Sequence, residues 1–201
     1  MAAGKGQVKN NMTEDRKMDI LNSAGEVFSK YGFHGAKIED IAKEAGIGKG
    51  TIYGYFDSKE SLFYEMIKYG IEEYEKGMEK ALNIDGSIRD KLIYLCRFHG
   101  DYLNRYIDIT QIVMTEKEVL PKKLMTEILM EKAKLFNRMV EIIKNGIDNG
   151  ELRKDLDPEL GTIIIIGSMN QFYGQKMFYE NIDYRKICPE DLIDTVLGGL
   201  M

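Results

Sequence analysis

Apolar residues recur along most of this 201-residue chain at the three- and four-residue spacing of an amphipathic α-helix. The first such stripe ends at Gly32 and contains Ile20, Leu21, Ala24, Val27 and Phe28. Only three prolines are present, and no segment alternates apolar and polar residues as a half-buried strand does. The sequence therefore predicts an all-α fold of about nine helices.

Capping signals predict where these helices begin. Thr13 is the expected N-cap of the first helix, and Asp57-Ser58 precedes a long helix that reaches about Leu82. Further starts are predicted after the loop Asn83 to Ser87, at Pro121, at Asp157-Pro158 for a helix reaching about Tyr179, and at Pro189, with a short helix between Ile107 and Val119.

The formal charge of −5 is unevenly distributed. Residues 1–70 contain ten Lys/Arg and ten Asp/Glu, whereas residues 71–201 contain 18 and 23. The N-terminal third is therefore the more basic part. Such a balance is compatible with nucleic-acid binding through a few local contacts.

The sequence gives little indication of a disulfide-rich, metal-binding, catalytic, secreted or membrane protein. Cys96 and Cys188 are too few for a disulfide framework and lack the Cys/His spacing of a zinc site. His34 and His99 stand apart from any nucleophile or carboxylate cluster, so we expect no catalysis, metal or cofactor. No apolar run has the length of a signal peptide or a membrane span, which predicts a cytoplasmic protein without membrane contact.

Residues 37–56 predict a helix-turn-helix. Ile38, Ile41 and Ala42 share one helix face, and Gly46 stands where a left-handed C-terminal residue is needed. After the turn Gly46-Ile47-Gly48, a second helix from Lys49 to Phe56 would bury Ile52 and expose polar side chains. A helix of this kind enters the major groove of DNA.

The glycines around Lys49 also invite an interpretation as a phosphate-binding loop. The P-loop pattern would require glycine at position 43 and Ser or Thr at position 50, which are Lys43 and Gly50 here. A dinucleotide fingerprint would require glycine in place of Tyr53. Neither nucleotide motif is present.

The segment resembles the DNA-binding signature of the TetR family of bacterial regulators, through Ile41-Ala42, Ala45-Gly46, Lys49-Gly50-Thr51-Ile52-Tyr53, Tyr55-Phe56 and Ser58-Lys59-Glu60. It departs from the usual pattern at Ala36-Lys37, Gly48 and Gly54. The resemblance implies a flexible tail (1–13), a DNA-binding domain (14–74) and a helical effector-binding and dimerisation domain (75–201). The residues it assigns to DNA are Lys37, Lys49, Gly50, Thr51, Tyr53, Gly54, Tyr55 and Lys59.

The body is rich in aromatic and methionine side chains, a composition that suits either a core or an adaptable ligand pocket. The resemblance favours a pocket for a small apolar or amphipathic effector, held non-covalently. The candidate lining residues are Tyr94, Phe98, Tyr102, Met114, Phe136, Met139, Met169, Phe172 and Tyr173.

The run Ile163 to Ile166 cannot point to one side of a helix, so this segment needs partners on opposite faces. Burial within one chain is one solution. The resemblance favours the other, a homodimer through the last two helices, with candidate interface residues Gly161, Ile164, Gly167, Ser168, Gln171, Gln175, Leu192 and Val196.

The resemblance thus implies a sequence-specific transcriptional regulator, a repressor that leaves a palindromic operator when an effector binds. A DNA-binding regulator controlled by a protein partner or by abundance is the alternative, distinguished by a filled core. A helical enzyme that borrows the DNA-binding fold would need convergent titratable groups, which the sequence does not suggest.

Overall fold

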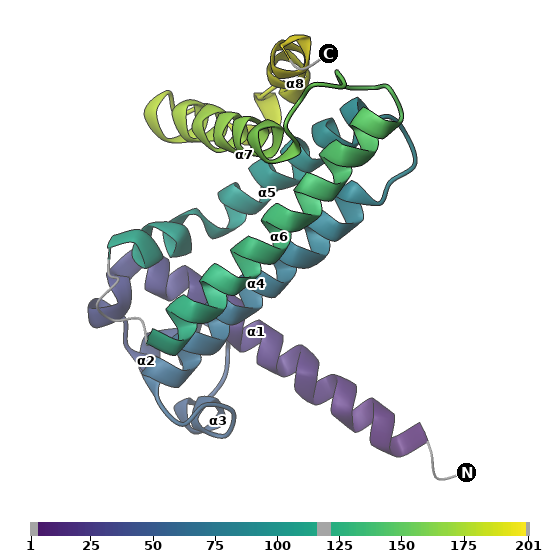
Figure 1. Cartoon of the computed structure of the whole chain (residues 1–201). Coiled ribbons are helices and arrows are strands. Elements are labelled where there is room, and N and C mark those ends of the chain that lie inside the picture. Colours follow the sequence, from purple (N-terminus) through teal and green to yellow (C-terminus); the bar gives the residue numbers. More distant parts are fainter. Residues whose placement is uncertain (1–3, 116–121, 200–201) are drawn as a thin grey trace. The chain divides into compact units, whose positions relative to one another are not determined.

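Helices account for all regular secondary structure in the part of the chain that the computed structural model describes, residues 4–115 and 122–199 (Figure 1). The surroundings of side chains are described for residues 14–106 and 122–199. Eight α-helices occur in these ranges, where about nine were predicted. They are α1 (Gly4–Gly35), α2 (Ile38–Glu44), α3 (Lys49–Tyr53), α4 (Lys59–Leu82), α5 (Ile88–Thr115), α6 (Lys122–Asp148), α7 (Pro158–Gly174) and α8 (Pro189–Gly198).

Several predicted boundaries are confirmed. Ser58 Oγ accepts a hydrogen bond from the Ser61 N–H (3.0 Å) at the start of α4. The Asp157 carboxylate accepts one from the Leu160 N–H (2.8 Å) at the start of α7. These side chains satisfy amide groups that a helix N-terminus leaves without a partner.

Other boundaries differ from the prediction. Helix α1 begins at Gly4 instead of after Thr13, and the residues between them contain no proline that would stop the helix. Helix α3 ends at Tyr53, not Phe56. The predicted short helix after Ile107 is part of α5, which is interrupted at Tyr106 and described through Thr115. Its predicted end and the Pro121 start lie outside the described residues.

The chain forms two compact units, which comprise the described residues of Met1–Glu72 with Tyr106–Met125, and of Glu73–Arg105 with Thr126–Met201. In the first unit, the rings of Phe28, Phe33 and Phe63 pack together, with centroids 4.9 to 5.9 Å apart. Burial of one such side chain contributes roughly 2 kcal/mol to folding. Ile41 and Ile52 are fully buried and attach α2 and α3 to this core.

The turn between α2 and α3 has a defined hydrogen-bond pattern. Gly46 adopts φ 63°, the Gly46 N–H donates to the Lys43 carbonyl (3.2 Å), and the Ile47 N–H donates to the Ala42 carbonyl (2.9 Å). This is a Schellman motif, which requires a left-handed residue. The predicted role of Gly46 is therefore confirmed.

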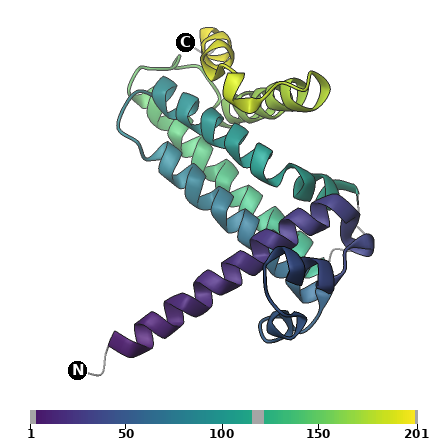
Figure 2. The same ribbon diagram turned by 180° about the vertical axis from the view of Figure 1, so that it is seen from behind.

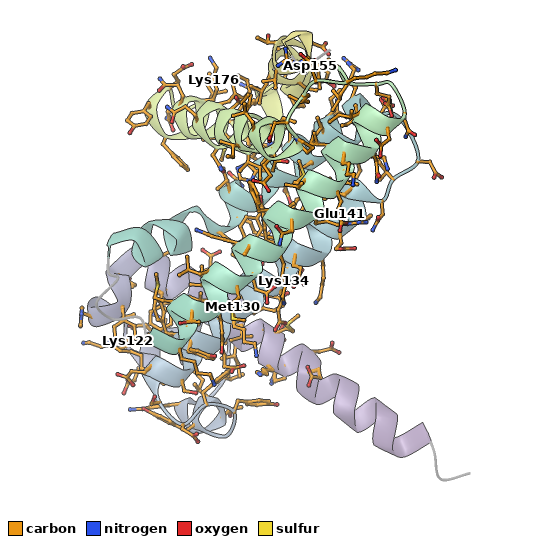
Figure 3. All side chains as sticks on the ribbon, viewed as in Figure 1. Lys122, Met130, Lys134, Glu141, Asp155 and Lys176 are labelled. Carbon is orange, nitrogen blue, oxygen red and sulfur yellow. The ribbon has the colours of Figure 1, made fainter. Side chains whose placement is uncertain are left out.

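In the second unit, the segments of α4, α5 and α6 run side by side in both views (Figures 1 and 2). Helices α7 and α8 belong to the same unit and share its core, through Ile165 and Ile193 among others. After Gly174 the backbone changes to a π-helical turn, η2 (Gln175–Tyr179), where Lys176 pairs with Glu180 at 2.9 Å (Figure 3). A short 3₁₀ segment, η3 (Tyr184–Lys186), precedes α8.

The core of the second unit contains a buried histidine. His99 on α5 is only 4% exposed, and its Nδ1 lies 3.0 Å from the Tyr74 hydroxyl. Its ring meets the rings of Tyr74 and Tyr173 edge to face. Burial lowers the pKa of His99 to about 4, so the imidazole is neutral at physiological pH. Burial raises the pKa of Tyr74 and of Tyr173, and raises that of the nearby Cys96 thiol to about 12.

Stability of the second unit should therefore fall as the pH drops from about 6.5 to about 4. In this window His99 of the unfolded chain binds a proton while the buried His99 does not, so unfolding takes up a proton. The loss by pH 4 should reach at most about 3 kcal/mol. Urea unfolding at successive pH values measures it, and the pH dependence should be shallower in His99→Phe. Parallel curves for the two proteins would show that His99 does not titrate in this way.

Candidate functional site

Helix α3 presents a small polar surface to solvent. Ile52 is buried beneath it, while Lys49, Thr51 and Tyr53 are exposed, with Tyr53 at 46%. A Cβ atom placed on Gly50 would meet no atom within 4 Å, so the helix backbone itself is accessible there. The structure thus brings five of the residues predicted to contact DNA, including Gly54, onto or directly after one short helix.

Lys49 is oriented by neighbours within the helix-turn-helix. Its Nζ lies 2.5 Å from Oε1 of Glu39 on α2 and 5.7 Å from the centre of the Tyr53 ring. The hydrogen bond from Lys49 lowers the pKa of Glu39, and Glu39 raises the pKa of Lys49. Both side chains are exposed, so salt or a phosphate group can compete for this ion pair.

Lys59 occupies a different position from the other predicted DNA contacts. Its Nζ donates to the carbonyls of Phe33 (2.8 Å) and Ala36 (3.1 Å), next to the C-terminal end of α1, and lies 4.6 Å from the centre of the Phe33 ring. A lysine in this position satisfies carbonyl groups that the helix end leaves open. The geometry gives Lys59 a structural function, and its contact with DNA stays a prediction.

The two remaining candidates lie outside α3, one before α2 and one after α3. Lys37 is exposed at the N-cap position of α2, and Tyr55 is half-buried with its ring beside Phe56. Exposed cations and hydroxyl groups at helix ends can reach phosphate oxygens. These positions are consistent with backbone contacts rather than base readout.

A second candidate site lies in the other unit, between α4 and α5. A pocket of about 580 Å³ opens to the surface there. Its lining consists of Glu73, Lys76, Gly77 and Lys80 from α4, and Tyr94, Arg97, Phe98, Asp101 and Arg105 from α5. Four of these side chains are basic and two are acidic.

Only some of the predicted effector-binding residues reach this pocket. Tyr94 and Phe98 line it. Tyr102 packs against Tyr74 with ring centroids 4.7 Å apart. Met139, Met169 and Tyr173 are buried in the core of the second unit, and Phe172 packs against it. Phe136 is half-buried on α6 and does not line the pocket. The side chain of Met114 lies outside the described residues.

The basic residues of the pocket were missed by sequence analysis, which considered only aromatic and sulfur side chains. A signal was present: Arg97, Asp101 and Arg105 recur every four residues on α5. Such spacing places them on one helix face.

One face of α7 is apolar and exposed. Leu160 is 52%, Ile163 56% and Ile164 38% exposed, and they follow helical spacing. Six of the other predicted dimer residues are also at least partly exposed, namely Gly167, Ser168, Gln171, Gln175, Leu192 and Val196. Gly161 is different, because it is buried against the side chains of Ile143 and Leu156. Leu160 and Ile163 were not predicted, although their register with Ile164 could have identified them.

In the described ranges, no group of His, Cys, Asp and Glu side chains is arranged to hold a metal ion. None of the described helices combines the length and apolar character that crossing a membrane requires.

Two parts of the chain match known protein families. Residues 20–66 match the family description "Bacterial regulatory proteins, tetR family", and residues 85–174 match "Tetracyclin repressor-like, C-terminal domain". The first match contains α2 and α3, and the second contains most of the pocket lining.

The chain is similar to the fatty acid metabolism regulator protein of Bacillus subtilis, with 29% identity over 77% of this chain and 79% of that protein. It is also similar to the crystal structure of the regulator FadR from Bacillus subtilis in complex with stearoyl-CoA, with a TM-score of 0.67, 25% identity, and 90% and 95% of the two chains covered. FadR from Bacillus halodurans has a TM-score of 0.69 and 22% identity, with 91% and 93% covered. Because the two family matches together cover more than half of its length and the whole fold agrees, the chain belongs to the TetR family of bacterial transcriptional regulators.

Proposed function

We propose that this chain represses transcription as a homodimer that binds a palindromic operator through α3 and leaves it when a fatty acyl-CoA thioester binds. We assign DNA binding to residues 14–74, and effector binding and dimerisation to residues 75–201. The observation that carries the proposal is the exposed surface of Lys49, Gly50 and Tyr53 on a helix fixed by a buried Ile52.

Lys49 and Tyr53 are the side chains best placed to bind phosphate. An ammonium and a phenolic hydroxyl can both donate to phosphate oxygens, and phosphate contacts fix the position of a recognition helix. Gly50 leaves the helix backbone open to close approach. The operator would then be selected partly by groove shape, since few side chains on α3 can reach base edges.

Lys49→Ala should weaken operator binding about tenfold at 0.1 M salt and lower the salt slope by about two, since a dimer loses two phosphate contacts. Tyr53→Phe should weaken binding without changing the slope, because it removes a hydrogen bond and no charge. Fluorescence anisotropy with labelled operator DNA at several salt concentrations measures both.

The control for this experiment is Lys68→Ala, which removes an exposed lysine of α4 and should leave binding and slope unchanged. Lys59→Gln separates the two roles of that residue. If Lys59 has a structural role, the variant should have a lower free energy of unfolding than the wild type. If Lys59 contacts phosphate, the variant should have a smaller salt slope of operator binding. Unchanged isotherms for both Lys49→Ala and Tyr53→Phe would contradict the assignment of α3.

The exposed aliphatic face of α7 supports the dimer. Leu160, Ile163 and Ile164 form a contiguous exposed apolar patch on α7. Such patches mark interaction sites. A twofold dimer would place one α3 in each half-site, about one helical turn of DNA or a multiple apart. Gly161 is not part of this surface, because it packs inside the chain.

Ile163→Asp should convert the dimer into a monomer, since it places a charge in an apolar interface. Light scattering at micromolar concentration should then give the mass of one chain instead of two, and operator affinity should fall. The matched control is Leu129→Asp, which alters an equally exposed aliphatic residue of α6 and should leave the dimer intact. A monomeric wild-type protein would refute the proposal.

The effector class follows from the relatives. The Bacillus subtilis FadR structure contains stearoyl-CoA, and the curated relative regulates fatty acid metabolism. A small-molecule effector needs a coupling free energy of only about 1 to 3 kcal/mol to change operator affinity 5- to 150-fold. The pocket between α4 and α5 lies in the unit to which effector binding is assigned.

Stearoyl-CoA at saturating concentration should weaken operator binding at least fivefold, because it binds the DNA-bound form less tightly. Anisotropy measures the release, and a thermal shift confirms direct binding. Coenzyme A alone and stearate alone are the controls, and each should have a smaller effect. Binding of stearoyl-CoA with no change in operator affinity would contradict this mechanism.

A further inference from the structure

The pocket between α4 and α5 has the charge expected of an anion-binding groove. Its four basic side chains exceed its two acidic ones, although residues 71–201 as a whole contain 18 basic and 23 acidic residues. Three of the four cations form an ion pair with a carboxylate. The pairs are Arg97–Glu190, Arg105–Asp101 and Lys76–Glu73. For Lys80 no ion pair occurs among the described residues, so its ammonium is available to a ligand.

The Phe98 ring forms part of the wall of this groove and rests on the backbone of α4. A Cβ atom on Gly77 would lie only 2.0 Å from the ring, so the contact is possible only because position 77 is glycine. The inner side of the ring faces Tyr74, with centroids 5.6 Å apart. Phe98 therefore contacts both the groove and Tyr74, the hydrogen-bond partner of His99.

His99 has a buried nitrogen without a partner. Its Nδ1 is hydrogen-bonded to the Tyr74 hydroxyl, whereas Nε2 is buried and has no hydrogen bond. If Nδ1 donated, the Tyr74 hydroxyl hydrogen would need another acceptor, so the favourable arrangement has Tyr74 donating to Nδ1. Nε2 then carries the hydrogen and is a donor that needs an acceptor. Buried groups of this kind are uncommon and call for an explanation.

We propose that the groove and His99 form one binding site for a phosphate-bearing acyl thioester, in which Lys80 and its basic neighbours bind phosphate and His99 Nε2–H donates to the thioester carbonyl oxygen. Phe98 turns away from Gly77 to admit the thioester. The acyl chain continues into the adjacent core, whose Met78, Met139 and Met169 can change rotamers at low cost. This inference rests on the proposed function, which supplies the class of ligand.

The carbonyl contact is tested by comparing stearoyl-CoA with its S-octadecyl thioether, which has the same phosphates and chain length but no carbonyl. The wild-type protein should bind the thioester about three- to tenfold more tightly by calorimetry, as expected for one hydrogen bond. His99→Phe should lose this preference by weakening thioester binding alone. His99→Gln, which can place an amide N–H near the position of Nε2, should retain part of it.

The groove is tested with Lys80→Gln, which should weaken binding of both ligands two- to fivefold and reduce the salt dependence. Its matched control is Lys134→Gln, which alters an exposed lysine of α6 (labelled in Figure 3) that does not line the groove, and this substitution should change neither quantity. Phe98→Ala should speed association of stearoyl-CoA several-fold, because the ring that covers the entrance is gone. An unchanged or slower rate would overturn the role of Phe98.

The outcomes separate this inference from the proposed function. If wild-type protein neither binds stearoyl-CoA nor releases the operator in its presence, the effector class is wrong. If it binds and releases the operator but has equal affinity for thioester and thioether, the His99 contact is refuted while the function stands. The wild-type comparison requires no substitution, so it remains decisive even if His99→Phe does not fold.

Discussion

The ammonium group of Lys59 holds the beginning of α4 to the carbonyl end of α1, and the position of the recognition helix depends on this contact. Lys59 Nζ donates to the carbonyl of Phe33, in the last turn of α1, and to that of Ala36, between α1 and α2. It also lies over the face of the Phe33 ring. The Phe28, Phe33 and Phe63 rings, which pack against one another, belong to the core on which α2 and α3 pack. Because α3 has only five residues, it could not persist alone in water. Its exposed side chains are useful only while this support keeps them in one orientation.

Much of the helical layout could be predicted from the sequence because its signals are local. The side chains of Ser58 and Asp157 accept hydrogen bonds from amide groups only three residues later in the chain. Gly46 adopts the positive φ that the turn between α2 and α3 requires at that position. The role of Lys59 could not be predicted in this way, since its partners lie 23 and 26 residues earlier in the chain. The end of α3 was also missed, because the apolar position of Phe56 fits both a longer helix and the observed turn.

The effector residues show a further limit of reasoning from residue type. Aromatic and methionine side chains were selected as pocket walls, yet Met139, Met169 and Tyr173 are buried in the core, because such side chains contact one another as readily as they would contact a ligand. The pocket formed instead at a surface where two helices carry basic side chains at matching spacing. Periodicity identifies which residues share a helix face. It does not identify which other helix that face packs against, and a pocket depends on both helices.

The unpartnered nitrogen of His99 also suggests why a ligand could change the conformation of this protein. A buried donor without an acceptor raises the free energy of the closed arrangement by about 1 to 3 kcal/mol. A ligand that supplies an acceptor removes this cost only in the conformation that binds the ligand. The ligand therefore has a higher affinity for that conformation, and this difference in affinity shifts the populations of the two conformations. The cost is comparable to the coupling free energies of known allosteric proteins. The core with an unsatisfied His99 is then the state that a thioester would displace, and the contact between Phe98 and Gly77, which no larger residue at position 77 would permit, is where that displacement would begin.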